Sequence, residues 1–277
     1  MAKSMPDVQS VLPAHIVLSR ELHQGGQRQV FEADINGRQC VLKLMPSSER
    51  LRAEREVAVG YGRVHPNLAE ILDASVVDIS IAGDDYVYFT EEFVDGDAVS
   101  PLIGAVDPCE ALKVISDLAS AVEHLWEEDR VVHRDIKPLN MIRKPDGTYV
   151  LLDVGIGRHQ LESSLTNPWG LLGTPGYFAP EQMIPSRRRA LDFRADLFLA
   201  GIVAFQLVTG QLPFDPAAID YPRQVQNGVT PGLLASLPAE LWPVFRRLLA
   251  PRPHQRFARF DQLRAEITTA SGALGCT

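Results

Sequence analysis

The stretch His-Arg-Asp-Ile-Lys-Pro-Leu-Asn, residues 133–140, constrains this chain more than any other. It places a carboxylate, an ammonium and a carboxamide in one loop, at Asp135, Lys137 and Asn140. Beyond a Pro-Asp-Gly turn and a strand-like run, Asp153 opens Asp-Val-Gly, so a hairpin is expected to return Asp153 towards Asn140. Two oxygen ligands on adjacent loops suit Mg²⁺, which prefers few protein ligands together with substrate phosphates. The loop therefore predicts phosphoryl transfer.

These residues resemble the catalytic loop of the eukaryotic-type (Hanks-type) serine/threonine protein kinases, whose signature is His-Arg-Asp-Leu-x-x-x-Asn followed by Asp-Phe-Gly and Ala-Pro-Glu. Here Ala179-Pro180-Glu181 supplies the last motif. A single motif of this length is more often a solvated loop, but several in the family's order and spacing favour the family. The resemblance extends over about residues 18–270.

The resemblance implies an α+β, bilobal protein-kinase fold. We expect an N-terminal tail at residues 1–15, then an N-lobe at 16–94 with a small antiparallel β-sheet and one helix. A mostly α-helical C-lobe is expected at 95–277. The length of 277 residues exceeds that of a typical domain and suits two lobes that make one functional domain.

Composition and charge are those of a globular protein that does not bind nucleic acid. The chain is 45% hydrophobic, with no run of about eighteen apolar residues and no signal-peptide segment, so we expect no membrane span and a cytoplasmic location. A net charge of -8 and a pI near 5.4 do not indicate the basic surface patch with which proteins bind nucleic acid. Cys40, Cys109 and Cys276 are widely spaced, which favours a reducing compartment over a disulfide or zinc framework.

The first third of the chain reads mainly as antiparallel strands. Residues 1–15 lack sustained periodicity and are interpreted as a tail or docking strap. From Ile16 the pattern is strand-like, and the Asn-Gly pair at 36–37 predicts a tight hairpin. A helix is expected from 47 to about 63, and a further strand over 69–77.

Lys43 ends the run Val-Leu-Lys, which resembles the family strand whose lysine holds the α- and β-phosphates of ATP. On its own, a strand lysine is usually an edge residue. The following helix carries Glu56 where the family places its ion-pairing glutamate, with Glu54 as the alternative if the register differs. By this resemblance, Glu56 positions Lys43 for catalysis.

The loop before Val30 corresponds to the phosphate-covering loop of the family but keeps little of its Gly-x-Gly-x-x-Gly pattern. Gly25 matches, whereas His23 and Arg28 stand at the other two glycine positions. These side chains restrict backbone approach to the phosphates, while Arg28 supplies a cation. Taken alone, the glycine pair is typical of an ordinary hairpin turn.

The resemblance also assigns an adenine site, with residues 92–94 as the hinge between the lobes. At its back wall, where the family usually has an apolar or small side chain, this chain has Glu91, which can compete with Glu56 for Lys43. Besides Lys43, the residues expected to contact ATP are Gly25, Val30, Val41, Glu92, Val94 and Ile142.

Further matches lie in the C-lobe. Asp196, in an apolar helix ended by glycine, corresponds to the family residue that holds the backbone of the catalytic loop. Arg256 corresponds to the arginine that pairs with Glu181. Thr174, in Gly-Thr-Pro-Gly-Tyr, is expected to contact the catalytic aspartate and lysine, and with the lysine it implies serine or threonine acceptors.

Thr166 is predicted to be an activating phosphorylation site modified by the kinase itself, with Ser163 and Ser164 as neighbouring candidates. Arg134, directly before the catalytic aspartate, is costly to bury without an anionic partner, and Arg158 is placed as the family's second cation. A phosphothreonine would bring close to two negative charges to these arginines. The alternative is that Arg134 pairs with a nearby carboxylate and the loop is not modified.

The resemblance implies a serine/threonine protein kinase that uses ATP and Mg²⁺, held by Asn140 and Asp153, and acts on protein substrates. A regulatory partner or a dimer is compatible with the sequence. A pseudokinase scaffold is the alternative, favoured by the eroded glycine loop, Val154 in place of Phe, and Gly60 one turn after Glu56. The charged residues needed for transfer are nevertheless retained, which favours the enzyme. A small-molecule kinase of the aminoglycoside type would lack the docking segment that ends in Ala-Pro-Glu.

Overall fold

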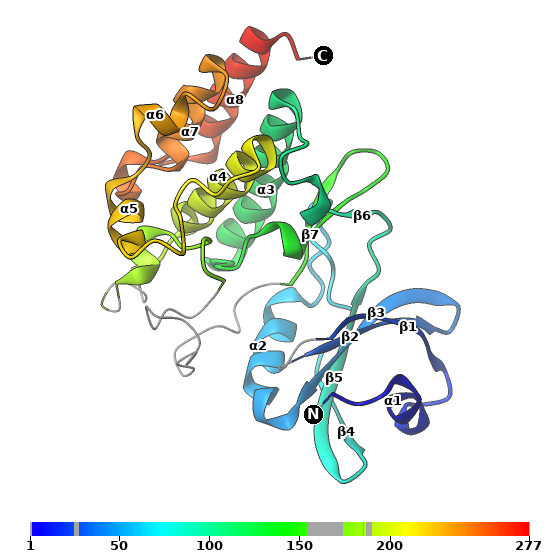
Figure 1. The fold of residues 1–277 in the computed structure, drawn as a ribbon. Helices are drawn as coiled ribbons and strands as arrows, with labels where there is room; N and C mark the ends of the chain where they lie inside the picture. The colour runs from blue at the N-terminus through cyan, green and yellow to red at the C-terminus, as the bar shows by residue number, and fades with distance from the viewer. Residues whose placement is uncertain (1, 25–27, 154–173, 185, 187–189, 277) are drawn as a thin grey trace. The chain divides into compact units, whose positions relative to one another are not determined.

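The computed structural model describes residues 2–24, 28–153, 174–184, 186 and 190–276. The chain divides into two compact units, Met1–Asp95 and Gly96–Thr277, which are described separately (Figure 1). The first is built on a five-stranded sheet and the second is mostly helical. This confirms the predicted α+β fold with a small β-sheet N-lobe and a helical C-lobe.

The sheet of the N-terminal unit is antiparallel, with strand order β1-β2-β3-β5-β4. The elements of this unit are α1 (Met5–Val11), β1 (Ile16–Gln24), β2 (Gln29–Ile35), β3 (Arg38–Pro46), α2 (Arg50–Gly60), β4 (Val77–Ile81) and β5 (Asp84–Glu92). The predicted Asn-Gly turn joins β2 to β3, and Asn36 and Gly37 have φ of 56° and 84°. These left-handed angles are those of a tight hairpin turn. The turn fixes the register that sets Val30 opposite Lys43.

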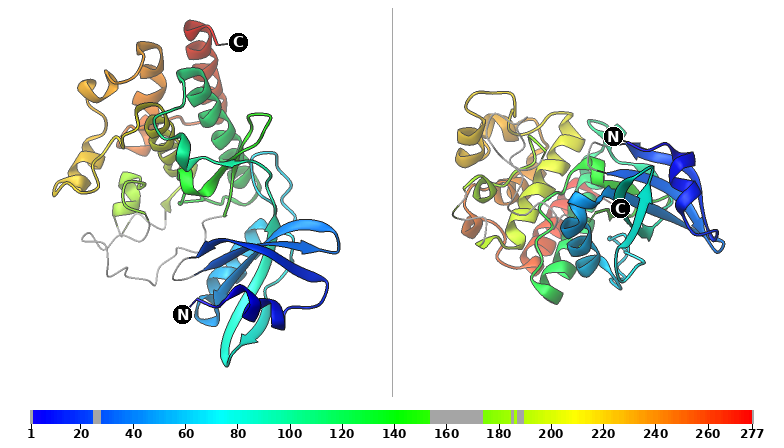
Figure 2. Two further views of the ribbon diagram at one scale, coloured as in Figure 1. Left: turned by 45° about the vertical axis from the view of Figure 1, so that its right-hand side comes forward. Right: turned by 90° about the horizontal axis from the view of Figure 1, so that it is seen from below.

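Different helices cover the two faces of this sheet. Side chains alternate along a strand, so Leu44 and Met45 of β3 face opposite ways. Leu44 belongs to a buried cluster with Val8 of α1, and Met45 to a second cluster with Val57 of α2. Figure 2 shows both helices against the sheet. By the same alternation, Lys43 projects to the face covered by α2.

Residues 1–15, interpreted as a tail or strap, contain the short helix α1. Ser4 caps it, because its hydroxyl oxygen accepts a hydrogen bond from the amide of Asp7 at 3.3 Å. Val8 is fully buried against the sheet, and the side-chain amide of Gln9 donates to the backbone carbonyl of Ile16 at 2.9 Å. A helix this short offers too few turns for its apolar period to be recognised. The segment therefore docks rather than trails.

The strand predicted over 69–77 is wrong, because β4 begins at Val77. The segment before it runs beside β5, where the amide of Leu72 donates to the carbonyl of Thr90 at 2.9 Å. Asp73 Oδ2, however, accepts hydrogen bonds from the Thr90 amide at 2.6 Å and from its hydroxyl at 2.7 Å. A carboxylate thus takes a donor that a regular ladder would pair with backbone.

The C-terminal unit combines helices with a small antiparallel sheet of order β6-β7-β8. Its elements are β6 (Asp97–Ala98), α3 (Pro108–Asp129), β7 (Met141–Arg143), β8 (Tyr149–Leu151), α4 (Phe193–Thr209), α5 (Tyr221–Asn227), α6 (Pro231–Leu234), α7 (Trp242–Leu248) and α8 (Phe260–Leu274). Short 3₁₀ turns occur in both units, at Ser47–Glu49, Ser100–Leu102, Pro138–Asn140, Pro180–Met183, Ala239–Leu241 and Pro253–Gln255. Helix α3 starts as predicted, with Asp107 accepting from the amides of Cys109 and Glu110 at 2.8 and 2.9 Å. Helices α3 and α4 lie side by side in the core of this unit (Figures 1 and 2).

Helix α4 is buried around nearly its whole circumference and ends, as predicted, at a glycine. Gly210 follows its last turn with φ of 75°, and its amide donates to the carbonyl of Gln206. This is a left-handed cap of the kind glycine favours. Within the described part of the chain, no helix has both the length and the apolar character needed to cross a bilayer.

The prediction that the cysteines form no disulfide is wrong for two of them. Cys109, in the first turn of α3, and Cys276, after α8, form a disulfide with Cα atoms 5.6 Å apart. They are 167 residues apart in sequence, so spacing gave no signal. Cys40 is free and buried, and burial raises the pKa of its thiol to about 11. The bridge ties the end of α8 to the start of α3, and such bridges typically stabilise a fold by roughly 2–4 kcal/mol.

Candidate active site

Asp196 of α4 holds the backbone of the loop at residues 133–140. Its Oδ2 accepts from the amide of His133 at 2.7 Å, and its Oδ1 accepts from the amide of Arg134 at 2.8 Å. Burial raises the pKa of Asp196 to about 7, and the two amide hydrogen bonds oppose that rise. Arg134 has φ of 70°, in a region that non-glycine residues seldom adopt. The buried carboxylate therefore stabilises a loop conformation that local sequence alone would not favour.

Four of the predicted catalytic and metal-binding side chains meet in this unit. Lys137 Nζ lies 3.2 Å from Asp135 Oδ1 and 2.8 Å from Thr174 Oγ1. Asn140 Nδ2 donates to Asp135 Oδ2 and to the Asp135 backbone carbonyl, both at 2.9 Å. Asp135, Lys137 and Asn140 are buried, and Thr174 is half-buried. The cluster thus combines a candidate proton acceptor, a cation and a hydroxyl.

The hairpin of β7 and β8 adjoins this cluster. The amide of Leu152 donates to the carbonyl of Asn140 at 2.8 Å, which brings the segment that carries Asp153 beside Asn140. The amide of Lys144 donates to the carbonyl of Thr148 at 2.8 Å and closes the turn. Because the Asn140 amide nitrogen is engaged by the catalytic loop, its side-chain oxygen is the atom left to act as a ligand. A carboxamide oxygen and a carboxylate on adjoining segments are hard ligands suited to Mg²⁺.

Two acidic residues of α3, not identified from the sequence, anchor this hairpin. Glu110 Oε1 accepts from Arg143 Nε and from the Tyr149 hydroxyl, both at 2.7 Å. Asp117 Oδ2 accepts from the amide of Tyr149 at 2.9 Å. Burial, with a further contribution from Glu110, raises the pKa of Tyr149. Little in the sequence singled them out, because acidic residues on a helix are usually solvated. The one sign was Tyr149 in a predicted strand, because a buried tyrosine hydroxyl needs a hydrogen-bond partner.

Lys43 lies between two carboxylates in the N-terminal unit. Its Nζ is 3.1 Å from Glu56 Oε1 and also hydrogen-bonds Glu91 Oε2. Lys43 is 2% exposed, Glu56 3% and Glu91 2%. Glu54, the alternative partner for Lys43, instead pairs with Arg50 at 2.8 Å. The structure therefore selects Glu56, and it also places Glu91 in contact with the lysine.

The residues expected at the adenine and phosphate sites are described within their separate units. In the N-terminal unit, Val30 on β2 and Val41 on β3 are half-buried, Glu92 ends β5 and Val94 is buried; in the C-terminal unit, Ile142 on β7 is half-buried. The predicted residues that lie outside the described part of the chain are Gly25, Val154, Arg158, Ser163, Ser164 and Thr166. Arg28 is described, and its guanidinium lies 3.5 Å from Glu56 Oε1.

Gly60, which suggested loose packing one turn after Glu56, has a packing role of its own. It ends α2, is buried, and lies against Ile71. A Cβ at this position would meet Ile71 Cγ1 at 2.7 Å, closer than real contacts allow. A larger side chain would therefore displace Ile71 from the core under α2. The glycine is explained by this contact and does not by itself indicate an impaired site.

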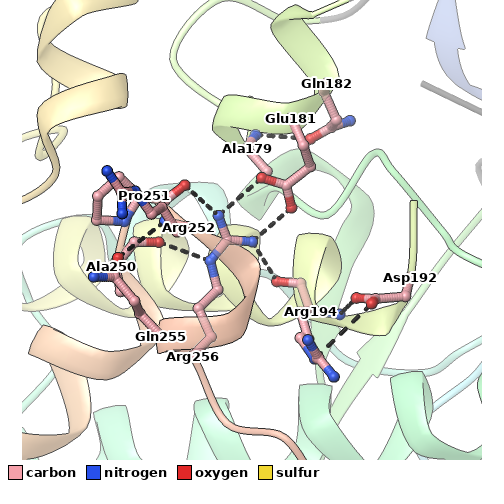
Figure 3. Close-up of polar contacts among 10 residues, drawn as sticks. All are labelled: Ala179, Glu181, Gln182, Asp192, Arg194, Ala250, Pro251, Arg252, Gln255 and Arg256. Atoms are coloured by element: carbon pink, nitrogen blue, oxygen red, sulfur yellow. Dashed lines mark hydrogen bonds and ion pairs between the residues drawn. The ribbon is translucent and has the colours of Figure 1, made fainter. Parts of the chain in front are cut away.

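Glu181 and Arg256 form a buried ion pair in the C-terminal unit (Figure 3). Arg256 NH1 lies 2.6 Å from Glu181 Oε1 and NH2 lies 2.9 Å from Oε2, so the pair is bidentate. The remaining guanidinium hydrogen bonds go to the carbonyls of Ala250, Arg194 and Pro251. This satisfies a charge that would otherwise be costly to bury. The pair therefore fixes the 3₁₀ turn Pro180–Met183, which carries Glu181.

Comparison with known proteins gives consistent similarities. Residues 17–266 match the family described as "Protein kinase domain". Serine/threonine-protein kinase PrkC of Bacillus subtilis is 28% identical over 269 residues, covering 92% of this chain and 40% of that protein. Serine/threonine-protein kinase PksC of Streptomyces coelicolor is 32% identical, covering 88% of this chain and 47% of that protein. Serine/threonine-protein kinase PknB of Mycobacterium tuberculosis is 26% identical, with coverages of 91% and 40%. The chain thus spans less than half the length of these relatives.

Proposed function

Because the chain belongs to the protein kinase family, we propose that it transfers the γ-phosphoryl group of ATP to serine and threonine hydroxyls of protein substrates. The observation that carries this proposal is the contact of Lys137 with both Asp135 and Thr174, at 3.2 and 2.8 Å. It puts a proton acceptor, a cation and a side chain of the docking segment within one hydrogen-bonded group. The similar bacterial proteins named above are serine/threonine-protein kinases, which supports the choice of acceptor.

Each residue of the cluster has a distinct part in this proposal. Asp135 orients the attacking hydroxyl and accepts its proton, for which a carboxylate within hydrogen-bond reach is required. Lys137 neutralises charge on the γ-phosphoryl group as it moves between oxygens. Thr174 holds Lys137 in place through the 2.8 Å hydrogen bond. Catalysis in this scheme is placement combined with charge stabilisation.

Asn140 and Asp153 are the proposed ligands for Mg²⁺. Their oxygens are of the hard type that this ion prefers, and their segments are joined by the hydrogen bond from Leu152 to Asn140. When bound, the ion supplies neutralisation of charge on the phosphate oxygens. The protein's own part is to orient the ligands. Asp135 does so for the Asn140 amide, and the hairpin does so for Asp153.

Residues proposed to contact the nucleotide occur in each of the two units. Lys43, positioned by Glu56, holds the α- and β-phosphates. The other proposed ATP contacts are Gly25 of the phosphate loop, Val30, Val41 and Ile142 around adenine, and Glu92 and Val94 at the hinge. The half-buried valines offer apolar surface of the kind that stacks on a base.

A pseudokinase scaffold is not favoured. Lys43, Asp135, Asn140 and Asp153 supply every charged or ligating side chain that the transfer reaction calls for. The packing of Ile71 against Gly60 accounts for one of the features that suggested a scaffold. The similar proteins are kinases by name.

Incubation of the purified protein with labelled ATP, Mg²⁺ and a library of serine- and threonine-containing peptides tests the proposal. We expect label on the peptides with wild type and a loss of roughly 10²–10⁴-fold with Asp135→Asn, because an amide cannot accept the proton. Asp261→Asn, at an exposed carboxylate paired with Arg259, is the matched control and should retain full activity. Wild type that labels no peptide, or Asp135→Asn as active as the control, contradicts the proposal.

We further propose that Thr166 is autophosphorylated and that the phosphate activates the enzyme. Burial lowers the pKa of Arg134, so its charge is held against a desolvation penalty that an added anion would relieve. Phosphate at Thr166 would form charge-assisted hydrogen bonds with such a cation. Losing one of these bonds predicts about a tenfold lower rate for Thr166→Ala.

Peptide mapping by mass spectrometry after incubation with Mg²⁺ and ATP tests this site, with Thr268→Ala on α8 as the control. Phosphate at Thr166 that appears in wild type and not in Asp135→Asn is expected. Phosphate absent from Ser163, Ser164 and Thr166 alike would rule out the mechanism, as would a Thr166→Ala variant with the rate of wild type.

A further inference from the structure

Glu91 stands beside Lys43 because of the register of two neighbouring strands. Strand β5 pairs with β3 so that Glu91 lies opposite Val41 and Phe89 lies opposite Lys43. Side chains two residues apart point to the same face, so Glu91 is the diagonal neighbour of Lys43 on the face covered by α2. The Lys43 ammonium lies 5.5 Å from the centroid of the Phe89 ring and reaches along the strand to Glu91.

Lys43 is surrounded by buried charges. The carboxylates of Glu56 and Glu91 both contact its ammonium, and the Arg28 guanidinium lies near Glu56. The side chains of Lys43, Glu56 and Glu91 are each 3% exposed, and that of Arg28 is 19% exposed. Each carboxylate contacts Lys43, and Glu56 also has Arg28 at 3.5 Å. In this arrangement the ammonium is already paired with two carboxylates before any nucleotide phosphate is present.

A lysine compensated in this way is a weaker ligand for phosphate. To bind an anionic phosphate, it must give up part of its interaction with a carboxylate that remains buried nearby. The buried environment strengthens both the attraction of Lys43 to Glu91 and the repulsion between Glu91 and phosphate. Glu56 also lies 3.5 Å from the Arg28 guanidinium, so it retains a cation when Lys43 turns to phosphate.

We propose that Glu91 is a positioning residue that holds Lys43 in a resting pairing and thereby lowers the affinity of the site for nucleotide phosphates. This role is regulatory, because the phosphates of ATP must compete with the Glu91 carboxylate of strand β5 for the Lys43 ammonium. This inference rests on the proposed function in taking Lys43 to be the phosphate ligand. It goes beyond that function because it assigns a role to Glu91: this residue weakens the binding of the phosphate groups and leaves the binding of the adenine ring unchanged.

Affinities of ATP and adenosine, measured by calorimetry on wild type and Glu91→Gln in Mg²⁺ buffer, test the proposal. Gln keeps the length and shape of the side chain and removes its charge, so the charged group that competes with phosphate for Lys43 is lost. We expect ATP to bind at least about tenfold more tightly to Glu91→Gln, the size of effect that one adjacent charge exerts on another. Adenosine carries no phosphate, so its affinity should stay the same.

Asp84→Asn is the matched control, because Asp84 begins the same strand, its side chain is 67% exposed and it pairs with Lys3 at 2.7 Å. It should change neither affinity. Glu91→Met, of similar length and apolar, provides a second variant if Glu91→Gln unfolds. Unchanged ATP affinity in the Glu91 variants, or an equal shift for adenosine, overturns the proposal. Wild type that binds ATP with the expected dependence on Glu91 but transfers no phosphate would instead count against kinase activity alone.

Discussion

Lys43→Met and Asp153→Asn are each expected to abolish phosphoryl transfer. Lys43 is the proposed ligand for the ATP phosphates, and Asp153 is one of two proposed ligands for Mg²⁺. Removing a single preorganised charge that stabilises a transition state typically lowers a rate by roughly 10²–10³-fold. We expect losses at least this large, measured as label transferred from ATP to peptide, with Lys113→Met at an exposed lysine of α3 as the control.

The two variants are expected to differ in stability. Asp153 is half-buried, and Asn keeps its size, so Asp153→Asn should unfold near the wild-type temperature. From the sequence alone, Lys43→Met would be expected to leave the fold intact as well. The structure changes that expectation, because the variant leaves the carboxylates of Glu56 and Glu91 buried without the ammonium that contacts both of them. Breaking a buried pair in this way costs about 3–5 kcal/mol.

A second substitution separates the two effects of Lys43→Met. Adding Glu91→Gln removes one of the two buried carboxylates that repel each other once Lys43 is gone. We expect the double variant to recover part of the lost unfolding free energy without regaining activity. Urea unfolding and peptide labelling measure the two quantities on the same preparations. Full activity in Lys43→Met or Asp153→Asn would show that the site is misplaced, and unfolding of Asp153→Asn would make its role structural.

The order of the motifs predicted several contacts between residues that are far apart in the sequence. Asp196 was expected to hold the catalytic loop, and it accepts both loop amides. Glu181 was expected to pair with Arg256, and the pair is bidentate. The same order placed Thr174 by Lys137. These contacts could be anticipated because the resemblance carries a three-dimensional arrangement that no local pattern contains.

Other features could not be predicted because they depend on tertiary contacts of this chain alone. The disulfide joins Cys109 to Cys276 across 167 residues, and neither cysteine stands in a recognisable spacing. Asp73 displaces a regular strand by binding Thr90, although its own neighbours favour extended backbone. Gly60 looked like a defect until the position of Ile71 was known. In each case the deciding partner is far away in sequence.

Arg256→Met is expected to destabilise the C-terminal unit strongly. The Arg256 side chain is 0% exposed and holds Glu181, which is itself 7% exposed, together with three backbone carbonyls. Met fills much of the volume but leaves the Glu181 carboxylate buried without its cation. Such a loss costs about 3–5 kcal/mol. In a unit of this size, each 1 kcal/mol lowers Tm by about 2–4 °C.

Thermal and urea unfolding, with the disulfide kept oxidised, measure this effect against Arg259→Met, whose side chain is 67% exposed and pairs with Asp261. The control should stay within about 0.5 kcal/mol of wild type, as surface substitutions usually do. Combining Arg256→Met with Glu181→Gln should recover part of the lost unfolding free energy, because the buried negative charge is then removed. The three backbone carbonyls still lack the donors that Arg256 supplied. An Arg256→Met protein as stable as Arg259→Met would mean that the ion pair contributes nothing beyond its packing volume. No recovery in the double variant would place the whole effect in the carbonyls of residues 194, 250 and 251 instead of in the buried carboxylate.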